Sequence, residues 1–174
     1  MSNTYFYENF FKDLLKERNN SGEIVRGNLI SGCISAFDHW LNEEEAEENI
    51  ILYSNILDAK ASLQLKDQIR QALKYYSFEA KFLCFYQALY LKYNVYKYNS
   101  EEERFKPFSS MKKFLREVQA SIREEKFIEV YIKDLECLIL GNYDMTLPFF
   151  CANEEGKAKL QSLAKMCGLF ILKQ

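Results

Sequence analysis

The chain contains one histidine, His39, and histidine is the side chain that most readily exchanges a proton near neutral pH. Asp38 precedes it, so a carboxylate could tune the imidazole as a general base. The apolar spacing around these residues predicts a helix, however, and adjacent residues on a helix point about 100° apart and rarely face each other. We therefore interpret His39 as a half-exposed residue near a helix end, beside a buried Trp40, with no catalytic role.

The cysteines show no metal-binding pattern. Their number is odd, no two have CxxC spacing, and none lies close to His39, so the paired ligands of a zinc finger or ribbon are absent. Each has apolar neighbours, which is typical of small buried side chains in a reducing compartment. We expect no metal and no cofactor. The cysteines are Cys33, Cys84, Cys137, Cys151 and Cys167.

The sequence lacks the motifs of nucleotide binding and serine hydrolysis. It has no GxxxxGK[ST], GxGxxG or GxSxG pattern. It has 25 carboxylates, but nothing singles out two at the separation that a glycosidase needs. An enzyme that uses carboxylates alone stays an open alternative. We predict that the chain is not an enzyme and has no catalytic residue.

Tyrosines concentrate between Tyr75 and Tyr98, where seven of the twelve lie among lysines. Aromatic rings beside basic side chains can stack on the bases of single-stranded RNA. The spacing of these rings is nevertheless that of a buried helix, and the lysines are few. We favour core packing here and keep a small helical RNA-binding or regulatory module as the alternative function.

The distribution of charge is strongly uneven. No lysine or arginine lies between Arg26 and Lys60, whereas seven acidic residues do. Since the whole chain has a formal charge of −2, the remainder carries about five more positive than negative charges. An acidic, nearly cation-free stretch attracts a basic partner and speeds its association. A solvated surface without a partner is the alternative interpretation.

The candidate partner-binding residues follow from this stretch. The glutamates would pair with lysines and arginines of the partner, and exposed aromatic rings would supply the desolvated anchor that interfaces need. The predicted set is Asp38, Trp40, Glu43, Glu44, Glu45, Glu47, Glu48, Tyr53 and Asp58.

Composition and termini restrict the partners and the location. A chain without a basic excess is poorly suited to coating nucleic acid, so we expect no DNA partner and regard RNA as disfavoured. The first residues lack the basic region and cleavage site of a signal peptide. Uncharged runs fall short of the ~20 apolar residues that cross a membrane. We expect a cytoplasmic protein that does not bind membranes.

Apolar spacing and the scarcity of glycine (6) and proline (2) favour helices over most of the chain. Asn42 is expected to cap a helix whose first turn is acidic, and Ser109 or Ser110 to cap another. The helix over 78–96 is so apolar that it should stand at the centre of a bundle. Helices are predicted over about 7–20, 21–40, 43–57, 62–76, 78–96 and 110–122.

The last third has a different pattern. Cys137–Leu140 and Met145–Cys151 flank turn residues and predict a β-hairpin, with Pro148 placing the second strand at an edge. Asn153 should cap a helix that ends at Gly168, and Leu169–Leu172 should form a closing strand.

The predicted fold is therefore α+β and mostly α. A bundle of five or six helices occupies residues 1–98, and a linker with an acidic triplet and Pro107 occupies 99–108. Residues 109–174 add one helix and a small ββαβ antiparallel unit that packs on the bundle as one compact domain.

The segments Leu140–Phe150 and Gly168–Leu172 resemble the C-terminal parts of small cytoplasmic immunity proteins from bacterial polymorphic and contact-dependent toxin systems. The similarity covers about the last 40 residues and rests on a turn, an aromatic strand, a short helix and a Gly-Leu-hydrophobic strand. It implies a non-catalytic protein that binds a toxin domain and blocks its active site. Many such toxins are basic nucleases, which agrees with the acidic stretch here.

The sequence thus favours a binding protein that neutralises a basic partner, and a toxin nuclease domain is the expected partner. The RNA-binding or regulatory module and the carboxylate enzyme are the alternatives.

Overall fold

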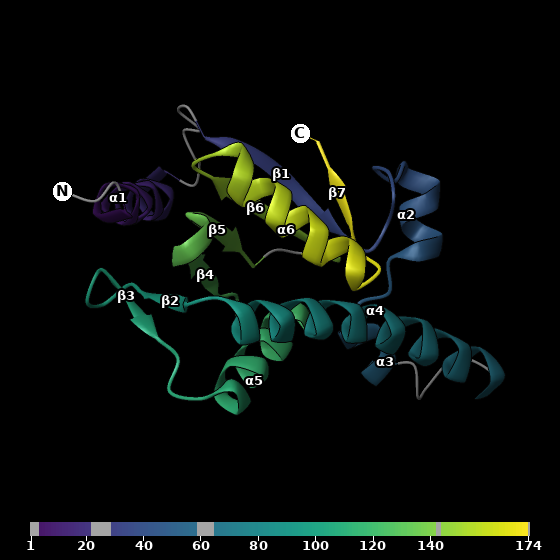
Figure 1. The fold of residues 1–174 in the computed structure, drawn as a ribbon. Helices are drawn as coiled ribbons and strands as arrows, with labels where there is room; N and C mark the ends of the chain where they lie inside the picture. The colour runs from purple at the N-terminus through teal and green to yellow at the C-terminus, as the bar shows by residue number, and fades with distance from the viewer. Residues whose placement is uncertain (1–3, 22–28, 59–64, 142–143, 174) are drawn as a thin grey trace.

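The structure is a computed structural model that describes residues 4–21, 29–58, 65–141 and 144–173. Its centre is a seven-stranded sheet in the order β3-β2-β4-β5-β6-β1-β7, with helices packed against it (Figure 1). All six strand pairings are antiparallel. The strands are β1 (Ile30–Ser35), β2 (Val95–Asn99), β3 (Arg104–Pro107), β4 (Glu129–Ile132), β5 (Cys137–Leu140), β6 (Thr146–Cys151) and β7 (Phe170–Leu172).

Helices precede β1 and lie in the β1–β2, β3–β4 and β6–β7 connections. None of those in the described part of the chain is both long and apolar enough to cross a membrane. They are α1 (Thr4–Ser21), α2 (Glu43–Asn49), α3 (Tyr53–Asp58), α4 (Leu65–Lys92), α5 (Met111–Ile122) and α6 (Glu154–Met166), with a 3-10 turn, η2, over Lys133–Leu135.

The central strands are buried on both faces. Along β5, Cys137 and Ile139 face the core shared with α4, α5 and α6, whereas Leu138 and Leu140 face a second core with α1. This is the two-residue period of a strand, since successive side chains point to opposite sides of a sheet. Burial of both faces explains why β5 is apolar at every position rather than alternating.

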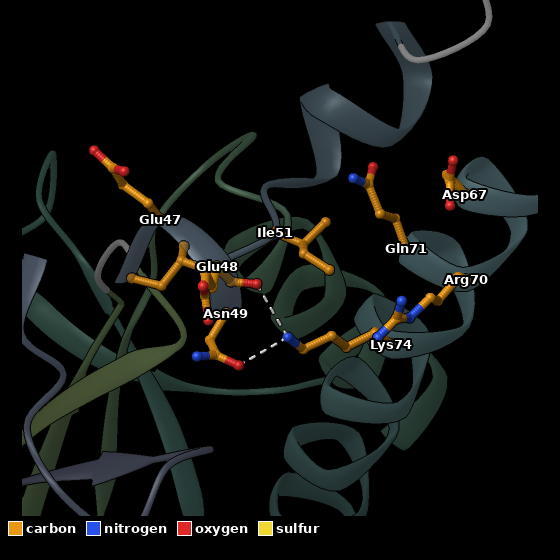
Figure 2. Close-up of a pocket in the computed structure, with 9 residues that line it drawn as sticks. Glu47, Glu48, Asn49, Ile51, Asp67, Arg70, Gln71 and Lys74 are labelled. Carbon is orange, nitrogen blue, oxygen red and sulfur yellow. Dashed lines mark hydrogen bonds between the residues drawn. The ribbon is translucent and has the colours of Figure 1, made fainter. Parts of the chain in front are cut away.

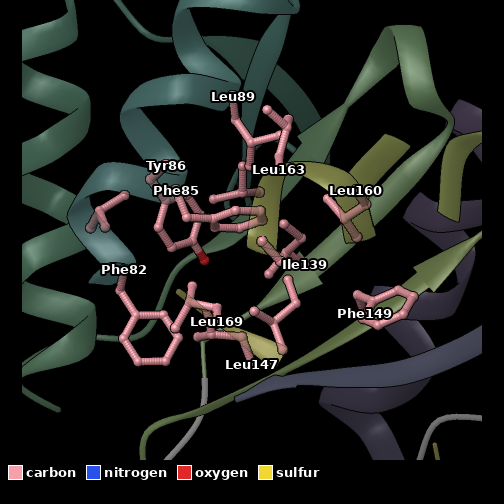
Figure 3. Packing of buried hydrophobic residues seen from close by; sticks show 14 of the residues in the cluster. Phe82, Phe85, Tyr86, Leu89, Ile139, Leu147, Phe149, Leu160, Leu163 and Leu169 are labelled. Carbon is pink, nitrogen blue, oxygen red and sulfur yellow. The ribbon is translucent and has the colours of Figure 1, made fainter. Parts of the chain in front are cut away.

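Helix α4 supplies much of the larger core. Phe82, Phe85 and Leu89 lie on its buried side and point at sheet and α6 residues, including Phe149 and Leu163 (Figure 3). The predicted separate helices over 62–76 and 78–96 are wrong, because no glycine or proline interrupts residues 65–92 and α4 runs through them. It covers one face of a sheet, so its expected place at the centre of a bundle is also wrong.

The helix predicted over 21–40 is the largest error. Residues 30–35 form β1, which lies between β6 and β7, and residues 22–28 lie outside the described part of the chain. A Cβ on Gly32 would lie 2.9 Å from both the Leu172 carbonyl oxygen and the Phe149 ring, so this position needs glycine. Strand pairing with distant residues therefore overrides the helical spacing of the local sequence.

The bundle with a small ββαβ unit is likewise contradicted. The hairpin of β5 and β6 is confirmed, but β6 also pairs with β1 and is not an edge strand. Pro148 is accommodated where pairing with β5 has stopped, at Phe149. The closing strand β7 exists, but it pairs with β1. Residues 99–108, expected to be a linker, contain the end of β2, the turn and β3 of the β2–β3 hairpin.

Predictions that rest on local signals are confirmed. The first helix is present as α1, and the side chains of Asn42, Ser110 and Asn153 cap α2, α5 and α6. Gly168 follows α6 with φ of +71°, the left-handed conformation expected after a helix.

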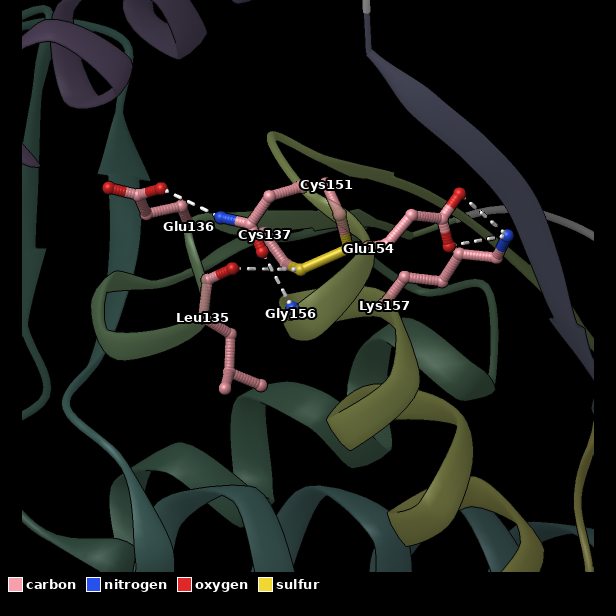
Figure 4. The surroundings of a disulfide bond; sticks show 8 residues. Leu135, Glu136, Cys137, Cys151, Glu154, Gly156 and Lys157 are labelled. Atoms are coloured by element: carbon pink, nitrogen blue, oxygen red, sulfur yellow. Dashed lines mark hydrogen bonds and ion pairs between the residues drawn. A yellow bond between two sulfur atoms is a disulfide. The ribbon is translucent and has the colours of Figure 1, made fainter. Parts of the chain in front are cut away.

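The prediction of five buried thiols is wrong for four cysteines. Cys137 and Cys151 are opposite each other in the β5–β6 register and form a disulfide beneath the start of α6 (Figure 4). Cys84 is exposed on α4, Cys33 is buried, and Cys167 is half-buried. The hairpin itself brings together two cysteines that are 14 residues apart in the sequence.

Gly156 allows α6 to approach this disulfide closely. A Cβ at this position would collide with the carbonyl oxygen of Leu135 and lie 3.2 Å from Cys137 Sγ. We predict that Gly156→Ala lowers the free energy of unfolding by about 1–3 kcal/mol, because the start of α6 must move away from η2. Urea denaturation measures this change.

The matched control is Ser162→Ala, an exposed position of the same helix, which should change stability by less than about 0.5 kcal/mol. Equal stability of the two variants would show that the close packing of Gly156 does not matter.

Candidate functional site

The acidic stretch forms a short helix whose start is held by a capping box. The Asn42 side chain accepts a hydrogen bond from Glu45 N at 2.9 Å, and Glu45 Oε2 accepts one from Asn42 N at 2.9 Å. Three glutamates in the first turn interact favourably with the positive end of the helix dipole. The segment therefore forms α2 although none of its residues is buried.

Four of the glutamates on α2 have exposed side chains: Glu43, Glu44, Glu47 and Glu48. Residues at these spacings share one side of a helix. Among the described residues, no ion pair is formed by any of these four carboxylates. We call them the α2 carboxylates. All four lie on α2, whereas Glu45 is used for capping and for a contact with His39.

An open groove of about 670 Å³ separates α2 from α4 (Figure 2). Lys74 reaches across it and donates to the Glu48 carbonyl oxygen at 3.2 Å and to Asn49 Oδ1 at 2.9 Å. Arg70 and Glu47 line the same groove, with the Glu47 carboxylate directed away from Lys74 (Figure 2). Two cations from a distant helix thus border the acidic stretch, so the expectation of a nearly cation-free surface is wrong on the side of α2 that faces α4.

His39 lies in a bend and contacts two carboxylates. Its Nδ1 is 2.7 Å from Asp38 Oδ1 and its Nε2 is 3.3 Å from Glu45 Oε1. Because the segment is not helical, the argument that Asp38 and His39 do not face each other is wrong. The hydrogen bond to Asp38, and then that to Glu45, raises the pKa of His39, while the bond to His39 lowers the pKa of Asp38.

Trp40 is 52% exposed, which contradicts the expected burial. Its indole N–H donates to the Lys173 carbonyl oxygen at 2.9 Å and so holds the ring beside the end of β7. The ring borders a hollow of about 340 Å³, whose walls also include Leu41, Ala46 and Leu172. An exposed aromatic side chain next to an apolar hollow and an acidic helix is suited to anchor a partner.

Tyr53 is not part of this surface. Its hydroxyl accepts from Arg123 Nη1 at 3.3 Å, and the guanidinium lies 4.3 Å from its ring centre. Arg123 is bound in turn by the buried Glu79, with Nε to Oε1 at 2.6 Å. Tyr53 therefore belongs to a network that joins α3, α4 and α5. The side chain of Asp58 lies outside the described residues.

The tyrosine-rich segment is largely engaged within the protein. Tyr75 and Tyr86 are buried, and their burial raises the pKa of both hydroxyls. Tyr90 stacks on Phe114 with ring centres 5.3 Å apart. Of the seven tyrosines in this segment, Tyr76 alone is exposed, with 45% of its surface accessible. These rings do not form the continuous platform on which successive bases stack.

Sequence reasoning missed Lys74 and Arg70, which a helix distant in sequence brings to the acidic stretch. No local signal identifies them, because their approach depends on how α4 packs. In the described part of the chain, no three His, Cys, Asp or Glu side chains are grouped closely enough to hold a metal ion.

The chain matches no protein-family model, and it has no significant match among curated proteins or solved structures. Its interaction surface must therefore be argued from its own residues.

The capping box provides a direct test of how α2 is held. We predict that Asn42→Ala destabilises α2 by about 1 kcal/mol, because the substitution removes the side-chain acceptor for the Glu45 amide. Amide hydrogen exchange within α2 should become roughly fivefold faster.

Asn153→Ala, which removes the corresponding cap of α6, is the control and should leave exchange in α2 unchanged. If exchange in α2 is the same in all three proteins, the capping box does not hold this helix.

Proposed function

We propose that this chain is a non-catalytic binding protein that neutralises a basic partner, and that it acts as an immunity protein covering the active site of a toxin nuclease domain. The observation that carries the proposal is the position of the α2 carboxylates. They are exposed, and they lie on the helix whose Ala46 lines the hollow beside Trp40.

The α2 carboxylates would act first on the rate of association. Clustered charges of one sign steer an oppositely charged protein and raise its association rate by tenfold or more at low ionic strength. On the groove side, Lys74 and Arg70 would compete with the partner's cations. We therefore assign the contact to the side of α2 that does not face Lys74 and Arg70.

The hollow beside Trp40 would supply the anchor. Its walls combine apolar groups such as Leu41 and Ile50 with the polar His39 and Asp144. A long side chain with an apolar stem and a charged tip, as in lysine or arginine, matches such walls. The hydrogen bond from Trp40 to Lys173 positions the indole before binding, so less conformational entropy is lost.

The C-terminal segments that resemble immunity proteins support the same proposal. They correspond to the end of β5, β6 and β7, and β7 is the strand against which Trp40 is held. The tyrosine segment, in contrast, is mostly packed into the core, and so we propose no RNA-binding function.

We predict that changing the four α2 carboxylates to glutamine slows association with the toxin domain at least tenfold at low salt, because the steering charge is lost. Glu45 stays unchanged to keep the capping box. Stopped-flow association rates at several salt concentrations, with a toxin nuclease domain that this protein neutralises as the probe, measure the effect.

The matched control removes the same number of charges elsewhere, with glutamine at Glu101, Glu125, Glu154 and Glu155, which are all exposed. This variant should associate at nearly the wild-type rate. Equal slowing of both variants would assign the effect to net charge, and an unchanged rate in the α2 variant would contradict the proposed surface.

A further inference from the structure

Two cysteines outside the disulfide lie in contact. Cys84 is exposed on α4, and Cys167 is the residue that ends α6. Their Sγ atoms are 2.8 Å apart although the residues are 83 positions apart in the sequence. The position of Cys167 is well defined, because its backbone N–H donates to the carbonyl oxygens of Leu163 and Ala164. Helix packing, rather than a loop, therefore brings the two thiols together.

We propose that Cys84 and Cys167 are a redox modification site at which a small disulfide, such as glutathione disulfide, converts the thiol pair into a reversible second disulfide. A disulfide has an S–S distance of about 2.05 Å, so the two sulfur atoms need to approach by about 0.8 Å. Such a displacement is within reach of side-chain rotation and a small shift of the helix end.

The reaction has two exchange steps. The Cys84 thiolate attacks one sulfur of glutathione disulfide, which forms a mixed disulfide and releases one glutathione thiolate. The glutathione thiolate released first accepts the proton of Cys167, and the Cys167 thiolate then attacks Cys84 Sγ, which breaks the mixed disulfide and releases the second glutathione. The two protons lost by the protein thiols end on the two glutathione molecules. The protein is oxidised by two electrons, and glutathione disulfide is reduced by two.

The surroundings of the thiols set the order of these steps. Burial, and then the hydrogen bond with Cys84, raises the pKa of Cys167 to about 12, so this thiol stays protonated at neutral pH. Cys84 is exposed on the helix surface and can meet the oxidant. Attack therefore begins at Cys84, and Cys167 acts as the resolving thiol.

The Cys84–Cys167 disulfide would link α4 to the chain segment that leads into β7. Cys167 is followed by Gly168 and then by β7, which pairs with β1. A link across 83 positions restricts the unfolded chain more than the existing disulfide, which spans 14. The melting temperature of the protein with this second disulfide should therefore be about 10 °C above that of the reduced form. The site does not depend on the proposed function.

Tryptic mapping after incubation of the folded protein with glutathione disulfide identifies the bond directly. Cys84 lies in peptide 82–92, Cys167 in 166–173 and Cys33 in 27–60, whereas Cys137 and Cys151 share peptide 134–157. We expect a cross-link between 82–92 and 166–173 that dithiothreitol removes. We also expect the rise in melting temperature to accompany it.

Cys84→Ser should abolish both the cross-link and the rise in melting temperature. Because residue 84 is exposed, this variant should still fold. Cys33→Ala, which changes a thiol outside the pair, should keep both. Glutathione left attached to Cys84 without a cross-link, or no modification of Cys84 at all, would overturn the proposal. A cross-link without any change in melting temperature would overturn its structural consequence.

Discussion

Burial of both faces of one antiparallel sheet is the constraint on which the remaining structure depends. Helix α1 covers part of one face, and α4, α5 and α6 cover the other, so the central strands carry apolar side chains in both directions. Helix α2, none of whose residues is buried, takes no part in covering the sheet. That helix is held by its cap and by Lys74, which leaves its charged side available for a partner.

The fold could be predicted from the sequence where local signals determine the structure. Caps such as Asn153, the left-handed Gly168 and the β5–β6 hairpin depend on neighbours within a few residues. Strand β1 could not be found in this way, because its spacing is helical and its conformation comes from pairing with β6 and β7. The charged β2–β3 hairpin resembled a linker because the strand that pairs with β2 is distant in sequence: β4 begins about 30 residues after β2 ends.

In the candidate site, too, local features could be predicted from the sequence and tertiary contacts could not. The acidic composition of α2 and the cap at Asn42 are evident in the sequence. The cations that border it and the network that takes up Tyr53 come from α4 and α5, so only tertiary packing could reveal them. The contact between Cys84 and Cys167 depends in the same way on how α6 ends against α4. Uniform apolar surroundings gave no indication of which cysteines meet.

The proposed function requires negative electrostatic potential on the surface around α2. The pKa of His39, the one histidine of the chain, responds to that potential. An NMR titration of His39 at low and at high salt measures this potential directly. We predict a pKa above the ordinary value of about 6.5 at low salt, because Asp38 and Glu45 stabilise the imidazolium, and a fall towards that value as salt screens the carboxylates. A pKa at or below 6.5 that does not respond to salt would contradict the account.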